Sequence, residues 1–421
     1  MGRLTMGLAA LWLTSAAWAA SGEGPAVTFH RDVEPILQQN CQSCHRPGEI
    51  APMAFRTYEE TRPWAQAIKE AVLLKRMPPW FADSTVDVHY KNDRSLSERQ
   101  INVLAAWADQ GAPQGDPADA PPPVEWTEGW ALGEPDLVFE LPKPFDVPAE
   151  GEVDYHYLVI PSGFEKDTWI QGVEIRPDNR TVLHHVIVYM RPQGSTWMED
   201  AKVGEFYLPT EGKEAKKTDK RFWLSGYAPG LPPKLHEAGR AQMAPAGADF
   251  VLELHYTPTG KTQQDQSRFG LTLATEEPSY EVKTKYVADF EFAIPPGAPN
   301  HRVDAELEIK EDMTITSFLP HMHLRGKSFE YTAIYPDGRE QVLLRVPRYD
   351  FNWQLYYDPV EPVLLPAGSK LHATAHYDNS PNNPANPDPT VEVKYGEQSW
   401  EEMMFGFFEV EVPVGQTASD D

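Results

Sequence analysis

Cys41-Gln42-Ser43-Cys44-His45 is the stretch that decides how the first part of this chain folds. In a C-x-x-C-H pentapeptide the two thiols can bond covalently to the vinyl groups of haem, while the adjacent imidazole ligates the iron. These are the only two cysteines among 421 residues, so none is left for a structural disulfide. The alternative is a redox C-x-x-C pair or a short disulfide loop. We expect one covalent haem c, held by Cys41, Cys44 and His45.

Amphipathic segments on both sides of the motif predict a small helical unit over residues 26–115. Two sets of apolar residues recur at helical spacing: Val33, Ile36 and Leu37, then Trp64, Ile68 and Val72. A third helix has both ends marked, because Ser97 and Gln100 form a capping box and Gly111 stops it. Its predicted apolar face is Ile101, Leu104 and Trp107. Three helices around one haem are therefore expected.

A second axial ligand to the haem iron is expected from the segment between the second and third helices. Met77 stands there in Arg76-Met77-Pro78-Pro79-Trp80, and the prolines stiffen the loop that would present its sulfur. Met53 is the main competitor, and His89 is a weaker one. From the haem motif to Gly111 the sequence resembles class I cytochromes c.

The first nineteen residues are typical of a cleaved export signal. Arg3 precedes an apolar run from Leu8 to Leu13, and the small-residue site Ala17-Trp18-Ala19 follows. No later apolar run is long enough to cross a bilayer, so we expect no integral membrane segment. The mature protein is predicted to be soluble and periplasmic, in the compartment where apo-cytochromes receive haem.

The formal net charge of −26 bears on the partners of the protein. Nucleic acid and anionic lipid would both be repelled, so neither is expected to bind. A cationic electron donor in the periplasm, or a neutral small-molecule substrate, fits this charge better.

The remainder of the chain is predicted to be β structure. Residues 116–134 are crowded with proline and alanine and form a linker. Short β-rich segments separated by turns then follow, at 157–160, 182–189, 250–255 and 331–335. Such a pattern favours antiparallel sandwiches, and the length favours two in tandem, at 135–280 and 281–413, with a tail at 414–421.

Three groups of histidines lie on predicted strands: His184-His185, His255, and His321-Met322-His323. In an H-x-H on a strand both imidazoles point to one face and form a pair suited to a transition metal. Adjacent histidines on a regular strand point to opposite faces, so the first pair shares a metal only if the strand ends or bulges. A single strand histidine such as His255 is ordinarily a satisfied polar residue.

His372 and His376 share a face of another predicted strand. They are either a further metal site or cross-strand packing, and packing is the favoured interpretation.

The order of four segments resembles the copper type II, ascorbate-dependent monooxygenases, which include peptidylglycine hydroxylating and dopamine β-monooxygenases. The segments are Leu183-His184-His185-Val186, Leu252-Glu253-Leu254-His255-Tyr256, His321-Met322-His323-Leu324-Arg325-Gly326-Lys327 and Glu402-Met403-Met404. The resemblance runs from about residue 135 to 412. It implies two jelly-roll sandwiches with a solvent-filled cleft between them, and two coppers per chain.

By this resemblance an electron-transfer copper is held by one set of ligands and an oxygen-activating copper by another. The sets are His184, His185 and His255, and His321, His323 and Met403. Met404 remains the alternative to Met403. Imidazoles suit a copper that changes oxidation state, and a thioether favours Cu(I), the form that meets O2.

One departure concerns the substrate. Peptide-processing members anchor a carboxylate with arginine, asparagine and tyrosine where this chain has Leu319, Phe405 and Phe407. A carboxylate would be unpaired there, so an apolar or aromatic substrate is expected. The predicted function is a periplasmic monooxygenase that hydroxylates a C–H bond with O2 and receives electrons through its haem. The alternatives are a non-catalytic electron-transfer or copper-carrying protein, and a scaffold that displays the cytochrome.

Overall fold

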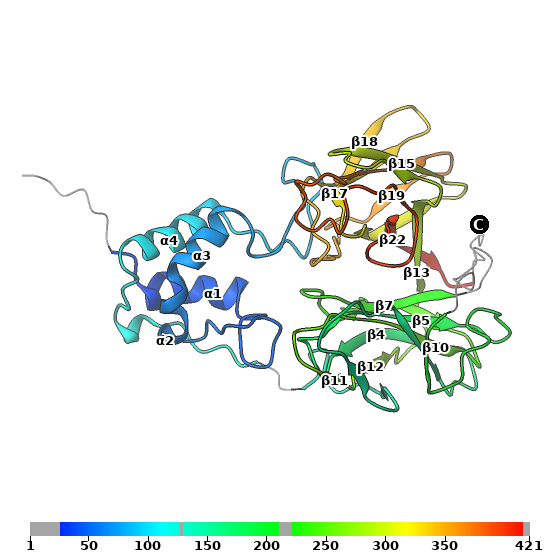
Figure 1. Cartoon of the computed structure of the whole chain (residues 1–421), viewed down its shortest axis with the longest axis horizontal. Coiled ribbons are helices and arrows are strands. Elements are labelled where there is room, and N and C mark those ends of the chain that lie inside the picture. Colours follow the sequence, from blue (N-terminus) through cyan, green and yellow to red (C-terminus); the bar gives the residue numbers. More distant parts are fainter. Residues whose placement is uncertain (1–25, 127–128, 210–220, 416–421) are drawn as a thin grey trace, which may run out of the picture.

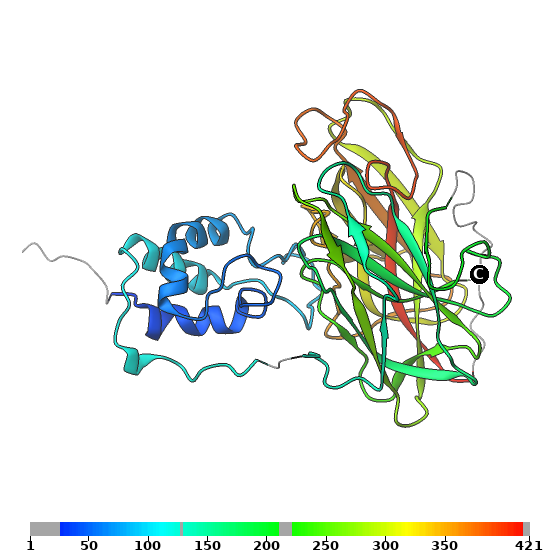
Figure 2. The ribbon, with the colours of Figure 1, turned by 60° about the horizontal axis from the view of Figure 1, so that its bottom comes forward.

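A computed structural model of the chain describes residues 26–126, 129–209 and 221–415. A small helical unit lies beside a larger β region made of two stacked sandwiches (Figures 1 and 2). The predicted export signal and most of the predicted tail lie outside the described residues. Within the described part, no helix is both long and apolar enough to span a membrane.

The helical unit packs around a core of its own. Its helices are η1 (Phe29–Val33), α1 (Glu34–Asn40), α2 (Tyr58–Thr61), η2 (Arg62–Trp64), α3 (Ala65–Leu73), α4 (Glu98–Asp109) and η3 (Pro117–Asp119). The predicted third helix is confirmed, because Ser97 and Gln100 form the capping box of α4 and Gly111 follows it with φ +83°. Trp64 differs from prediction, since it precedes α3 and is 40% exposed.

The segment between α3 and α4 leaves the helical unit and packs on the second sandwich. Phe81 and Tyr90 are buried in that sandwich's core. The Tyr90 hydroxyl donates to the carbonyl of Leu343 at 2.6 Å, and Tyr90 also forms an isolated β-bridge with Pro359. This segment therefore connects the helical unit to the β region. The sequence predicts that residues 26–115 form one unit, but this part of the range packs on the second sandwich instead.

The first sandwich contains twelve strands in its described residues, 135–209 and 221–279. They are β1 (Leu137–Glu140), β2 (Phe145–Val147), β3 (His156–Pro161), β4 (Thr168–Arg176), β5 (Leu183–Arg191), β6 (Phe206–Tyr207), β7 (Phe222–Tyr227), β8 (Lys234–Leu235), β9 (Arg240–Ala244), β10 (Asp249–Tyr256), β11 (Gln263–Asp265) and β12 (Arg268–Leu273). One sheet has the order β6-β3-β10-β5-β7, and the sheet behind it contains β1, β12, β4 and β9. Alternate residues of β10, such as Leu252 and Leu254, fill the core between the sheets.

The second sandwich contains the remaining strands of the part of the chain that the structure describes. Its strands are β13 (Tyr280–Asp289), β14 (Ala293–Ile294), β15 (His301–Glu308), β16 (Met313–His321), β17 (Gly326–Ile334), β18 (Glu340–Val346), β19 (Val363–Leu365), β20 (Lys370–Tyr377), β21 (Val393–Lys394) and β22 (Met404–Pro413). Its inner sheet has the order β13-β22-β16-β19, and its outer sheet has the order β15-β20-β17-β18. Two tandem β-sandwiches are therefore present, as the sequence predicts.

The two sandwiches are joined by backbone pairing and by a buried ion pair. Strand β13 pairs in parallel with β9, so that one sheet runs through both sandwiches. Lys234 on β8 lies 2.9 Å from the carboxylate of Glu409 on β22. These contacts bring the sheet that contains β5 and β10 opposite the sheet that contains β16 and β22 (Figure 1). The predicted metal ligands lie on β5, β10 and β16, or in the residues directly beside β16 and β22.

Candidate metal centres and haem cavity

A β-bulge brings the first histidine group together. In the pairing of β10 with β5, His255 is opposite His185 and Tyr256 is opposite Leu183, so His184 is the extra residue. The bulge is the condition under which adjacent histidines can share one face. His184, His185 and His255 consequently form a cluster whose candidate ligand atoms lie within 4.8 Å of one another. This set is called the first cluster below.

The nitrogen positions in the first cluster fit a bound metal ion. Nδ1 of His185 lies 3.2 Å from Nδ1 of His184 and 3.4 Å from Nδ1 of His255. Imidazole nitrogens bind a metal ion at about 2.0 Å, and tetrahedral geometry then places them about 3.3 Å apart. Two of the three pairs of Nδ1 atoms thus have the spacing of ligands to one metal ion, and imidazole nitrogens are among the donors that copper takes in proteins.

Burial keeps these imidazoles neutral. It lowers the pKa of His255 to about 3, and it also lowers the pKa values of His184 and His185. A neutral imidazole has the lone pair that a metal needs. Tyr155 packs edge-on to His185 at 5.1 Å and against His255 at 4.5 Å, so an aromatic ring encloses this side of the cluster.

The second histidine group lies at the end of β16. Strand β16 stops at His321, so Met322 and His323 lie in the following turn rather than on a strand as predicted. The rings of His321 and His323 are nevertheless 5.2 Å apart, and these two residues are called the second cluster below. The turn is held by Glu402, whose buried carboxylate accepts from the backbone N–H groups of His323 at 2.8 Å and Arg325 at 2.6 Å.

In the second cluster the Nδ1 atoms are already occupied. Nδ1 of His321 donates to the side-chain oxygen of Gln354 at 2.8 Å, and Nδ1 of His323 donates to the carbonyl of Glu401 at 3.3 Å. Both partners are acceptors, so both Nε2 atoms keep a free lone pair for a metal. Burial lowers the pKa of His321 to about 4. The two clusters therefore offer opposite ring nitrogens.

The two candidate methionines differ in their surroundings. Met404 is fully buried in the core of the second sandwich. Met403 immediately precedes β22 and is half-buried, and its carbonyl accepts from the Tyr377 hydroxyl at 2.7 Å. Met403 remains the predicted sulfur ligand, because the side chain of Met404 is packed in the core.

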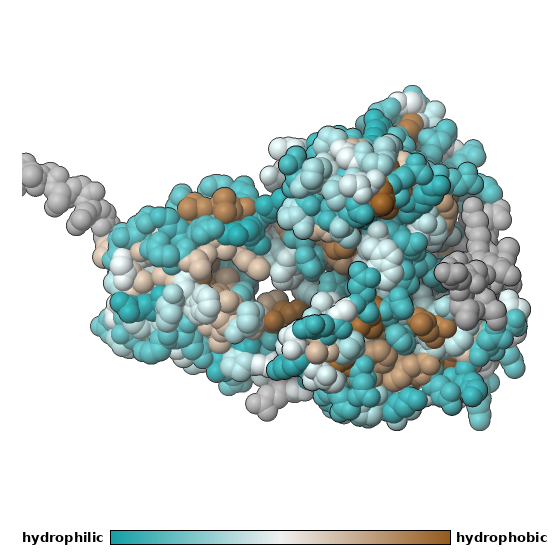
Figure 3. Space-filling view, viewed as in Figure 1, coloured by the Kyte–Doolittle hydropathy of each residue, from teal (hydrophilic) through white to brown (hydrophobic). Residues whose placement is uncertain are grey.

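A cavity of about 570 Å³ lies where the helical unit meets the β region. Its size falls within the roughly 300–1,000 Å³ of small-molecule sites. Cys41, Cys44 and His45 line it, together with apolar residues of α1, α3 and α4. Met53 and Met77 both line it as well, so the choice between them stays open. Apolar surface also gathers on the outside of this junction (Figure 3).

The residues of this cavity suit a haem in two further respects. Nδ1 of His45 donates to the carbonyl of Met53 at 3.2 Å, which leaves Nε2 free as an iron ligand. Arg94 and Arg180 also line the cavity and are cations suited to haem propionates. Arg180 comes from the first sandwich and lies 3.5 Å from Glu49 of the helical unit.

The β region supplies the far wall of the same cavity. Residues 180–184, Thr257 and Trp353 line it, so His184 belongs both to the first cluster and to the haem cavity. Nothing in the sequence pattern singled out Trp353, Gln354 or the arginines, because their roles arise from contacts between distant segments. The free thiols and the three histidine groups were the signals that sequence could offer.

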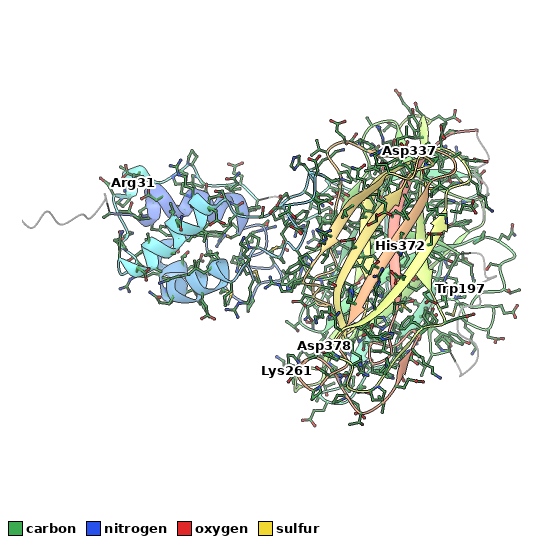
Figure 4. The ribbon with its side chains drawn as sticks, turned by 90° about the horizontal axis from the view of Figure 1, so that it is seen from above. Arg31, Trp197, Lys261, Asp337, His372 and Asp378 are labelled. Carbon is green, nitrogen blue, oxygen red and sulfur yellow. The ribbon has the colours of Figure 1, made fainter. Side chains whose placement is uncertain are left out.

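His372 and His376 do not join either cluster. They lie on β20 in the outer sheet of the second sandwich, on the face that Figure 4 shows with His372 labelled. His372 contacts Asp304 at 3.0 Å, and His376 contacts the Ser328 hydroxyl at 3.2 Å. Both therefore have cross-strand partners, which agrees with the interpretation as packing.

Comparison with known proteins gives one informative similarity. No family model matches the chain. The chain is 26% identical over 225 residues to DBH-like monooxygenase protein 2 of Mus musculus, a match that covers 47% of this chain. It spans about a third of that relative's length, namely 34%.

Solved structures resemble the chain only distantly. They include infectious bursal disease virus (11% identity, 68% of this chain and 74% of that one, TM-score 0.18), allantoicase (11%, 56% and 81%, 0.18) and PNGF-II (10%, 66% and 60%, 0.23). TM-scores this low carry no argument. The chain is thus similar in sequence to one protein that is named as a DBH-like monooxygenase.

Proposed function

We propose that this chain is a periplasmic copper-dependent monooxygenase that hydroxylates a C–H bond of a small apolar substrate. One oxygen atom of O2 enters the substrate and the other is released as water. The reaction consumes two electrons and two protons. We further propose that a c-type haem in the helical unit delivers the electrons. The observation that carries the proposal is the position of His184, which belongs to the first cluster and lines the haem cavity.

The ligand sets support one copper at each cluster. His184, His185 and His255 would hold the first through Nδ1, and His321, His323 and Met403 would hold the second through Nε2 and sulfur. Copper at such sites supplies one-electron redox chemistry and a centre that reacts with O2. The protein's own contribution is to hold the imidazoles neutral and to fix their orientation through Gln354 and Glu401.

The helical unit supports the haem part of the proposal. Cys41 and Cys44 are free and half-buried beside an apolar cavity, and His45 presents Nε2. A tethered one-electron donor has a high effective concentration at the first cluster, because no second molecule has to diffuse to it. An external periplasmic donor, cationic to match the acidic protein, would then reduce the haem.

Aromatic residues beside the second cluster support an apolar substrate. Phe405 and Phe407 stack at 5.0 Å, and Trp223 of the first sandwich packs on Phe407 at 5.3 Å. Phe407 lies 6.2 Å from the ring of His321. The space there is about 10 Å³, about enough for one water molecule. A substrate bound at this place would therefore have to move these rings apart.

The test begins with copper and haem counted per chain in copper-reconstituted protein. We expect two coppers and one haem, with His184→Ala and His321→Ala each losing one copper. A screen of apolar compounds should then reveal substrate-dependent oxygen uptake. One copper or none would contradict the two-centre proposal and favour a copper-carrying or electron-transfer protein. Unchanged redox behaviour after loss of both clusters would favour a scaffold that displays the haem unit.

A further inference from the structure

The ring of Phe351 contacts one histidine of each of the two clusters. Its ring stacks on His184 of the first cluster, with centroids 5.1 Å apart and an interplanar angle of 18°. The same ring meets His323 of the second cluster edge-on, at 5.9 Å and 78°. Phe351 is 8% exposed, so water has little access to it. The resemblance described above implies a solvent-filled cleft at this place, whereas here one phenyl ring contacts both clusters.

The segment that carries Phe351, residues 349–354 between β18 and β19, is anchored at both ends. At one end the Tyr349 hydroxyl donates to the carbonyl of Met322 at 2.7 Å and accepts from its N–H at 3.1 Å. Met322 stands between the two histidines of the second cluster. At the other end Gln354 accepts from His321 at 2.8 Å. The ring of Phe351 is thus fixed by the same turn that presents the second cluster.

The segment also reaches the haem cavity. Trp353 lines that cavity, and its ring packs so closely on Gly230 that a Cβ at residue 230 would lie 2.7 Å from it. Gly230 also has φ +78°, so a side chain there would be strained as well as crowded. One short stretch of chain therefore contacts the haem cavity, the first cluster and the second cluster.

We propose that Phe351 is the contact through which an electron passes from the metal of the first cluster to the metal of the second. This inference rests on the proposed function. With copper at both clusters, the first copper would be oxidised from cuprous to cupric while the second would be reduced from cupric to cuprous. No bond forms or breaks, and no proton moves. Phe351 is a positioning residue in this role, because it packs on the ligands and does not bind the metals.

The experiment follows two successive electrons in anaerobic, copper-loaded protein. A photochemical donor reduces the haem repeatedly, and haem reoxidation is followed by visible absorbance. The first electron reduces the first cluster's copper. The first cluster's copper can accept a second electron from the haem only after the first electron has passed to the second cluster. Haem reoxidation therefore has two phases. Freeze-quenched samples examined by electron paramagnetic resonance show which cupric signal disappears, and His321→Ala protein identifies the signal of the first cluster.

Phe351→Leu should leave the first phase unchanged and slow the second by about tenfold or more. Phe351→Ala should slow the second phase further. Electron transfer between the clusters depends on close approach, which a misplaced or missing ring weakens. Phe81→Leu is the matched control, since Phe81 is 8% exposed in the same core and its ring faces the Arg348 guanidinium rather than a histidine. It should leave both phases unchanged. Copper content, haem content and circular dichroism confirm that each variant is folded and loaded.

A second phase that is equally fast in wild type and Phe351→Leu would overturn the role of Phe351 while leaving the proposed function intact. Absence of the first phase in wild type would instead contradict the route from haem to copper. In that case a small-molecule donor replaces the haem, and the two cupric signals still report whether passage between the clusters depends on Phe351.

Discussion

Replacing Gln354 by leucine should weaken copper binding at the second cluster and leave the first cluster unaffected. The Gln354 side-chain oxygen is the acceptor for Nδ1–H of His321, at 2.8 Å. This contact fixes the tautomer that leaves Nε2 for the metal. Leucine has nearly the same bulk but no acceptor, so the imidazole would be free to rotate or to carry its proton on Nε2.

The size of the effect follows mainly from the loss of this contact, because the other hydrogen bond of the Gln354 side chain, from its amide nitrogen to the carbonyl of Phe351, is long at 3.4 Å. Removing a partner from a buried donor costs about 1–3 kcal/mol. Loss of an outer hydrogen bond to a metal ligand typically weakens metal affinity about 10–100-fold, which corresponds to about 1.4–2.8 kcal/mol. The two ranges agree, so we expect a 10–100-fold weaker second copper site. Gln354→Glu keeps an acceptor and should retain the affinity of wild type.

Competition with a chelator of known copper affinity measures both sites in one titration, and electron paramagnetic resonance assigns each to its cluster. The first cluster serves as an internal control, because Gln354 contacts none of its histidines through the hydrogen bonds described. Equal copper affinities in wild type and Gln354→Leu would refute the reasoning. A loss at both clusters would indicate instead that the substitution unfolds the loop.

Three further outcomes are expected. Replacing Cys41 and Cys44 by serine should abolish the haem that stays with the denatured chain, seen as loss of haem stain on a denaturing gel, while copper content is retained. Arg180→Gln should lower the haem reduction potential in a potentiometric titration, because a nearby cation disfavours the more positive ferric state. Lys234→Met should cost about 3–5 kcal/mol in urea unfolding, and adding Glu409→Leu should recover most of it. Burial opposes the charge of Glu409 but Lys234 outweighs it, so the pKa of Glu409 lies below 4.5, and its contribution to stability is lost as pH falls through that lowered pKa. In Lys234→Met protein the largest influence left on Glu409 is burial, which raises its pKa against a smaller lowering by His236, so this dependence should reverse.

Local sequence determined those features that depend on neighbouring residues. The capping box at Ser97 and the helix that follows it formed as expected, because a cap and an amphipathic face are properties of one short segment. The strands around residues 157, 184, 252 and 331 formed for the same reason. Successive side chains of each strand point alternately to the core and to the opposite face of the sheet. The histidine series was also visible, since a ligand's chemistry is independent of the fold.

Tertiary structure alone decided how these parts meet. Sequence indicates that His184 needs a bulge, but the bulge exists only because β10 pairs with β5 in a particular register. Phe351 and Gln354 carry no local pattern, and they acquire their contacts because the segment between β18 and β19 folds back over both clusters. His184 likewise reaches the haem cavity only because the chain before α4 packs on the second sandwich. Such contacts join residues far apart along the chain, and their free energy depends on the packing of whole sheets, which no short stretch of sequence contains.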